Sequence, residues 1–140
     1  MILNELLQEC AEVNATITLP FDLRQKSRFK SKLDSGEPVS LLLSRGLVLR
    51  DGNVLKSESG FKVKVVAAPE SVSTVYSDNV LMLLKASYHL GNRHVPLQIT
   101  ETFVRYQADH VLDQMINQLG LQVLSEKAAF EPESGAYAKH

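Results

Sequence analysis

The sequence contains no tryptophan, a single cysteine (Cys10) and no long run of apolar residues. One cysteine cannot close a disulfide within the chain, so a secreted disulfide scaffold is excluded. Apolar runs such as Val80–Leu84 are far shorter than the roughly 20 residues that a membrane-spanning helix needs. The N-terminus also lacks the basic and apolar regions of a secretory signal. These absences predict a soluble, cytoplasmic protein with no membrane partner.

The chain also lacks an excess of either charge, since 15 basic and 16 acidic residues leave a net charge of −1. No whole-molecule field therefore attracts nucleic acid. The motifs of serine hydrolases, P-loop enzymes, dinucleotide-binding enzymes and zinc proteases are absent, and the acidic residues are scattered. We therefore expect a protein that is not an enzyme and does not bind nucleic acid.

The first half of the chain has the pattern of short β-strands separated by turn residues. A turn with strong signals follows Leu33, in the sequence Asp-Ser-Gly-Glu-Pro. Turn signals recur at intervals of roughly ten residues, as in small sandwiches and barrels, and no helix of normal length is needed. We predict an all-β domain over residues 1–69 with strands at Ala15–Leu19, Arg28–Leu33, Val39–Leu43, Gly46–Leu49 and Phe61–Val66.

The second half alternates strand and helix patterns. One helix begins after an N-cap at Ser77 or Asp78, presents an apolar stripe (Val80, Leu81, Leu83, Leu84, Tyr88) and ends at Gly91. A second helix runs between Asp109 and Gly120. The predicted strands are Val72–Tyr76, Leu97–Thr100, Thr102–Tyr106 and Gln122–Leu124.

This β-α-β-β-α-β order is that of a ferredoxin-like domain, which we place at residues 70–129. Residues 130–140 contain proline, glycine and charges and are predicted to form a flexible tail. The fold class is therefore α+β, with a small all-β domain before a ferredoxin-like domain.

All four histidines lie in the second half: His89, His94, His110 and His140. None shows the spacing of a paired helical metal site. His94 stands out because it follows the helix-ending Gly91 and precedes Pro96, so a turn would hold it. It is either a metal ligand or an ordinary surface histidine that is bonded to a loop carbonyl.

The other candidates have weaker support. His110 falls in the first turn of the second helix, where the helix dipole slightly favours a neutral imidazole that can bind metal. His89, near the end of the first helix, is predicted to be structural, and His140 could ligate only by folding back from the tail. Cys10 fits a small buried side chain better than a metal thiolate.

Five cations recur at every second position in the first half: Arg24, Lys26, Arg28, Lys30 and Lys32. On a strand they would share one face. Two interpretations stand: a docking ridge for an acidic protein surface, or edge protection against pairing with other chains. Nucleic-acid binding fits less well, because only Phe29 interleaves the cations.

The segment Tyr88–Ile99 (Tyr-His-Leu-Gly-Asn-Arg-His-Val-Pro-Leu-Gln-Ile) resembles the signature of the UreE family, the urease accessory metallochaperones. Further resemblances cover nearly the whole chain. They lie at Leu33–Glu37, Arg45–Gly52, Arg105–Asp113 and Phe130–Tyr137.

The resemblance implies a β domain of the peptide- or partner-binding type, followed by a metal-binding and dimerisation domain. Such proteins are homodimers that carry Ni(II) to the urease apoprotein–accessory complex and work with the GTPase UreG. By this resemblance His94 of both subunits would be the central ligand, and His110 an auxiliary one. Two departures are that Ala108 stands where some relatives have a histidine, and that the chain ends at Lys139-His140 without a histidine-rich tail.

A two-fold axis near His94 would bring two imidazoles to one ion, which a single imidazole could not hold firmly. Zn(II) or Cu(II) could replace Ni(II) in vitro, because imidazole suits all three metals. Metal could also join dimers into a dimer of dimers. We therefore expect a nickel metallochaperone with His94, His110 and His140 as candidate ligands. The alternative is a partner-docking module that acts through the basic strand, with metal binding incidental.

Overall fold

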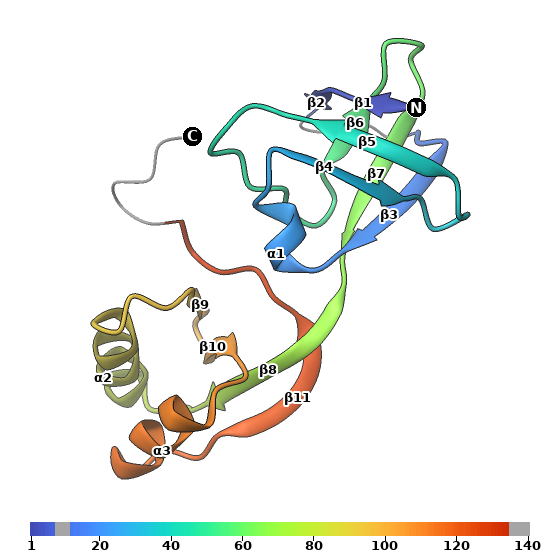
Figure 1. Cartoon of the computed structure of the whole chain (residues 1–140). Coiled ribbons are helices and arrows are strands. Elements are labelled where there is room, and N and C mark those ends of the chain that lie inside the picture. Colours follow the sequence, from blue (N-terminus) through green and yellow to red (C-terminus); the bar gives the residue numbers. More distant parts are fainter. Residues whose placement is uncertain (8–11, 135–140) are drawn as a thin grey trace. The chain divides into compact units, whose positions relative to one another are not determined.

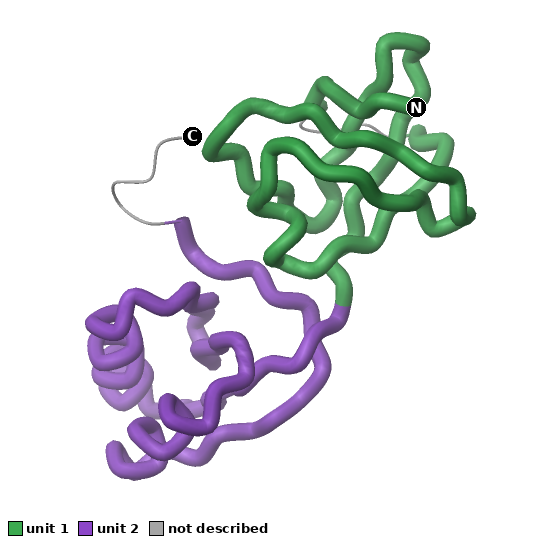
Figure 2. The backbone as a smooth tube through the Cα atoms, viewed as in Figure 1, with its two compact units in different colours: residues 1–68, 136–140 green, residues 69–135 purple. Residues whose placement is uncertain are grey.

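The computed structural model describes residues 1–7 and 12–134. The chain divides between Ala68 and Pro69 into an N-terminal unit and a C-terminal unit (Figure 2). Each unit has its own hydrophobic core. Cys10 and His140, two residues singled out in the sequence, lie outside the described residues.

The N-terminal unit consists of two sheets (Figure 1). One has the strand order β1-β5-β4 and comprises β1 (Ile2–Leu3), β5 (Pro38–Leu42) and β4 (Arg28–Lys32). The other has the order β2-β6-β7-β3 and comprises β2 (Glu5–Leu7), β6 (Val54–Lys56), β7 (Lys62–Ala67) and β3 (Ala15–Leu19). Leu3, Leu41, Ile17 and Val65 are fully buried in one shared core. This confirms the expected small β domain, because alternate residues of each strand face the core.

Four of the five predicted strands of this unit form, but the one at Gly46–Leu49 does not. Gly46 adopts a positive φ of 78° in a turn, and the N–H of Leu49 donates to the carbonyl oxygen of Arg24 (2.9 Å) outside any sheet. The apolar side chain of Leu49 is fully buried although Leu49 lies in no strand, and this burial explains the apolar pattern that we interpreted as a strand. The short strands β1, β2 and β6 were not predicted.

Arg24 does not belong to the predicted row of cations. It ends the four-residue helix α1 (Phe21–Arg24) and is fully buried. Its Nε donates to the carbonyl oxygen of Leu19 (3.0 Å) and its Nη1 to that of Leu49 (3.2 Å). Lys26 lies in the following loop, so the row on β4 is reduced to three cations.

The C-terminal unit has the predicted ferredoxin-like topology. Its elements are β8 (Pro69–Tyr76), α2 (Val80–Gly91), β9 (Gln98–Ile99), β10 (Phe103–Gln107), α3 (His110–Gln118) and β11 (Leu124–Ala129). The antiparallel sheet has the order β11-β8-β10-β9, which is that of the split βαβ motif.

Buried residues of α2 (Leu83, Ala86, Leu90) and α3 (Leu112, Ile116) pack with Val75, Val104 and Tyr106 of the sheet. Asp109 caps α3 as predicted, since its Oδ1 accepts from the N–H groups of Val111 (2.9 Å) and Leu112 (3.2 Å). The cap of α2 is Asn79 rather than Ser77 or Asp78, because Asn79 Oδ1 accepts the N–H of Met82 (3.3 Å).

The end of the unit differs from expectation. The last strand, β11, begins at Leu124, where the predicted strand ends, and pairs with β8 over its whole length. Phe130 is fully buried, and the Glu133 N–H donates to the Leu97 carbonyl oxygen (2.8 Å). Residues 130–134, which we expected in a flexible tail, are therefore held in place, because Phe130 is buried and the N–H groups of Glu131 and Glu133 bond to Gln98 and Leu97 of the C-terminal unit.

Candidate metal centre

The backbone at His94 is held in an unusual conformation by the end of α2. The N–H of Arg93 donates to the Leu90 carbonyl oxygen (3.0 Å), and the N–H of His94 donates to that of Gly91 (3.0 Å). His94 has a φ of 56° and is the one non-glycine residue with positive φ in residues 1–7 and 12–134. A side chain in this left-handed region costs about 1 kcal/mol, which glycine would avoid. The fold thus tolerates strain to place an imidazole at this turn.

The imidazole of His94 is exposed to solvent. Within the described part of the chain it has no hydrogen-bond or ion-pair partner, so the bond to a loop carbonyl that the alternative interpretation included is not formed. Three residues further on, Leu97 is buried and anchors the turn in the core. The side chain is therefore presented outward from a fixed backbone, with its nitrogen atoms available to a ligand.

His110 is also exposed and is the first residue of α3. The segments that flank His94 and His110 meet around a hollow of about 240 Å³. Val95 and Pro96 line one part of it, and Ala108 and Asp109 another. The structure thus brings the neighbourhoods of the two candidate ligands together, although they are sixteen residues apart in sequence.

Tyr106, which lines the same hollow, fixes the start of α3. Its hydroxyl donates to Asp113 Oδ1 over 2.6 Å. Burial, and then the hydrogen bond to the Asp113 carboxylate, raise the pKa of Tyr106 well above its usual range. The neutral phenol therefore ties the first turn of α3 to β10, which keeps His110 in a constant position.

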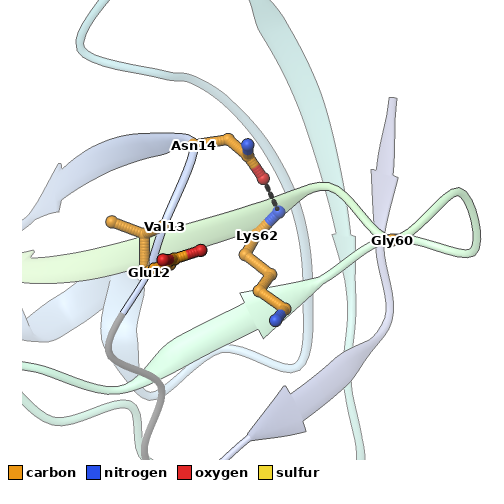
Figure 3. Close-up of a pocket in the computed structure, with 5 residues that line it drawn as sticks. All are labelled: Glu12, Val13, Asn14, Gly60 and Lys62. Carbon is orange, nitrogen blue, oxygen red and sulfur yellow. Dashed lines mark hydrogen bonds between the residues drawn. The ribbon is translucent and has the colours of Figure 1, made fainter.

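A single chain does not complete a metal site with these residues. Residues 1–7 and 12–134 contain no group of three or more histidine, cysteine, aspartate or glutamate side chains that could hold an ion. The methyl side chain of Ala108 has no atom that could bind a metal. The half-buried ring of His89 contacts Tyr88 edge-on, with 5.2 Å between the ring centroids. A larger hollow of about 540 Å³ in the N-terminal unit offers the side chains of Glu12, Asn14 and Lys62, which do not form a metal-ligand set (Figure 3).

The apolar stripe predicted for α2 is split between two faces. Leu83 is buried in the core, whereas Val80, Leu81, Leu84 and Tyr88 are 63%, 57%, 61% and 66% exposed. Their spacing places these four side chains along one side of the helix, which leads toward the turn of His94. The sequence already indicated this exposed apolar surface, because the apolar residues of α2 cover more than the one face that a surface helix buries. A contiguous exposed apolar surface of this kind usually marks an interface.

Comparison with known families agrees with the motif around His94. The family model described as UreE urease accessory protein, N-terminal domain, matches residues 3–68, and the model of the C-terminal domain matches residues 70–140. The chain belongs to the UreE family of urease accessory proteins. This confirms the resemblance seen in the sequence. UreE proteins act in urease assembly with the partners of urease maturation and are not enzymes.

Individual relatives carry the same name. The chain is 57% identical to the urease accessory protein UreE of Alkalilimnicola ehrlichii over 98% of this chain and 84% of the relative. It is 49% identical to that of Pseudomonas putida over 98% of this chain and 86% of the relative. For Alcanivorax borkumensis the identity is 57% over 87% and 72% of the two chains. No helix in residues 1–7 and 12–134 is long and apolar enough to cross a membrane.

Proposed function

We propose that this protein is a nickel metallochaperone that delivers Ni(II) during urease metallocentre assembly, with the ion held between His94 of two subunits. The observation that carries the proposal is the exposed imidazole of His94, held at positive φ within the motif of the UreE family. Strained backbone at an exposed polar side chain is typical of functional positions.

The homodimer is supported by the exposed face of α2. A monomer would leave Leu81, Leu84 and Tyr88 in water, whereas an isologous contact would bury each of them against the same face of a second copy. The turn with His94 follows this helix directly. A two-fold axis at this end of α2 would therefore pair the two histidines, and the pair would supply what one chain lacks.

His110 is proposed as an auxiliary ligand, because the residues beside it share the hollow with the residues beside His94. His140 is the third candidate ligand and would have to approach from the C-terminal end of the chain.

Imidazole is a suitable ligand for Ni(II), Cu(II) and Zn(II). The intrinsic affinity of a site with two imidazoles is higher for Cu(II) than for Ni(II). Nickel selectivity would then come from the supply of metal in the cytoplasm and from the delivery complex, which comprises the urease apoprotein, its accessory proteins and the GTPase UreG. Few fixed ligands leave open coordination positions, which lets the ion leave for its acceptor. Metal that bridges exposed histidines could also join dimers into a dimer of dimers.

Isothermal calorimetry tests the proposal. His94→Ala should abolish the tightest Ni(II) binding, while His89→Ala, which removes a half-buried imidazole five residues earlier, should leave it intact. Circular dichroism would establish that both variants fold. Full Ni(II) affinity in the His94→Ala variant would show that the proposed site is wrong.

A further inference from the structure

Strand β4 lies at the edge of its sheet and carries three exposed cations. In the described residues it pairs only with β5, and β3 approaches its other side just past the strand, where the Asp34 N–H donates to the Thr16 carbonyl oxygen (3.0 Å). Along Arg28–Lys32 that other side has no paired strand. Arg28, Lys30 and Lys32 are exposed, while the alternate residues Phe29 and Ser31 are half-buried. None of the three cations has an ion-pair partner among the residues that the structure describes. The edge thus presents three unneutralised charges on one face.

The backbone N–H and C=O groups of the same three residues point away from β5. The Leu43 N–H donates to the Ser27 carbonyl oxygen (2.7 Å), and the Leu33 N–H donates to that of Glu37 (2.9 Å), so the hydrogen-bonded pairs fall at odd-numbered residues of β4. In an antiparallel ladder these pairs alternate strictly. The N–H and C=O groups of Arg28, Lys30 and Lys32 are therefore directed toward the free side of the strand.

The face that carries the cations also has an apolar part. Register places Leu42 opposite Arg28, and Ile2 beside Ser40, which is opposite Lys30. Leu42 and Ile2 are 42% and 49% exposed. A row of cations on an open edge, next to exposed apolar side chains, forms a surface suited to a chain with both acidic and apolar side chains.

We infer that β4 binds an extended segment of a partner protein that adds as a further strand and carries acidic residues at alternate positions. Its backbone would bond to the outward groups of Arg28, Lys30 and Lys32. Its acidic side chains would then lie directly beside the cations, at the short distance of cross-strand pairs. This binding does not depend on the metal site.

Edge protection alone would explain cations on a free strand. It leaves the exposed Leu42 and Ile2 on the same face unexplained, because protection is weakened by apolar side chains nearby. Nucleic acid is disfavoured, because the described residues of this face include no exposed aromatic side chain on which bases could stack.

The test uses the full chain and a fluorescent peptide that alternates glutamate with valine, followed by anisotropy at low ionic strength. One control peptide has the same composition with all glutamates together, and a single-stranded DNA oligonucleotide is a second probe. The variants are R28E/K30E/K32E and the matched charge reversal R45E/K64E/K127E, whose residues are exposed elsewhere. Lys30→Pro removes one outward N–H, and Lys30→Gln removes the charge but keeps that N–H.

The expected result is that the alternating peptide binds and that R28E/K30E/K32E weakens it by about tenfold or more, as three exposed ion pairs would imply. Lys30→Pro should weaken it more than Lys30→Gln, and the matched reversal should leave binding within about twofold. Absence of peptide binding, equal binding of the block peptide or the oligonucleotide, or equal loss in the matched reversal would each overturn the inference. Unchanged Ni(II) binding in all variants would separate this result from the metal site.

Discussion

The hydroxyl of Thr16 donates a hydrogen bond of 2.6 Å to the carboxylate of Asp34. Asp34 lies in the turn after β4, and Thr16 lies on β3, so this bond joins the two sheets of the N-terminal unit. Thr18 strengthens the connection through its N–H (3.1 Å) and its hydroxyl (2.8 Å). The hydrogen bond from Thr16 is the main cause that holds the pKa of Asp34 below its usual value.

Asp34→Asn should therefore reduce the free energy of unfolding by about 1 kcal/mol, because a charged acceptor at a solvated site is replaced by a neutral one. Since the folded-state pKa is lowered, the contribution of Asp34 is present above the unfolded pKa of about 3.9 and is lost as pH falls below it. Urea unfolding at neutral and acidic pH measures both effects. Glu37→Gln, an exposed carboxylate in the same turn, is the control. A variant as stable as the wild type at neutral pH would refute this role.

Tyr106→Phe should cost about 1–2 kcal/mol of folding stability, because a partly buried hydrogen bond is lost and the Asp113 carboxylate loses its phenol partner. The raised pKa of Tyr106 also predicts an alkaline effect. Above pH ~10 the phenol ionises in the unfolded state but not in the folded state, so stability should fall by about 1.4 kcal/mol per pH unit. Denaturation at neutral and high pH compares the two proteins. If the variant retains the same alkaline loss, another group causes it.

His94→Gly and His94→Ala should differ in stability although both remove the imidazole. Alanine keeps a side chain at positive φ, whereas glycine removes this strain, so the glycine variant should be more stable by about 1 kcal/mol. Thermal unfolding of the two variants gives the difference. Equal melting temperatures would mean that the turn relaxes and that the strain at His94 is not maintained in solution.

Leu84→Lys should convert the proposed dimer to a monomer, because a charge would enter the centre of the exposed α2 face. Lys85→Glu changes the next residue, which is also exposed but lies off the apolar row, and should leave the dimer intact. Sedimentation equilibrium measures the mass, and circular dichroism tests the fold. If the Leu84→Lys variant keeps the mass of the wild type, the interface lies elsewhere.

The sequence predicted the fold well where residue patterns are local. The alternation of apolar residues in β7 and the apolar stripe of α3 follow burial directly, and the Asp109 cap marks where α3 begins. The predicted bounds of these two elements therefore agree closely with the observed ones. Long-range pairing was less visible. Strand β11 has few β-forming residues and exists because β8 provides a full ladder of hydrogen bonds. Arg24 follows the same two-residue spacing as the strand cations, but only the fold shows that it is buried.

For the metal centre, the motif identified His94, but neither its positive φ nor its free imidazole could be read from the sequence. The proximity of the His110 neighbourhood depends on how α3 begins beside the turn after α2. The outward face of α2 was misassigned, because helical periodicity cannot say which apolar side chains meet the core when a helix is apolar on two sides.

Native mass spectrometry of mixed dimers tests the central claim most directly. Wild-type and His94→Ala subunits of distinguishable mass would be mixed, so that dimers with two, one or no copies of His94 are titrated together with Ni(II). A shared ion predicts tight binding by the wild-type dimer, much weaker binding by the mixed dimer and no tight binding by the variant dimer. Tight Ni(II) binding by the mixed dimer at the wild-type level, or by a monomer, would contradict a site built from His94 of two subunits.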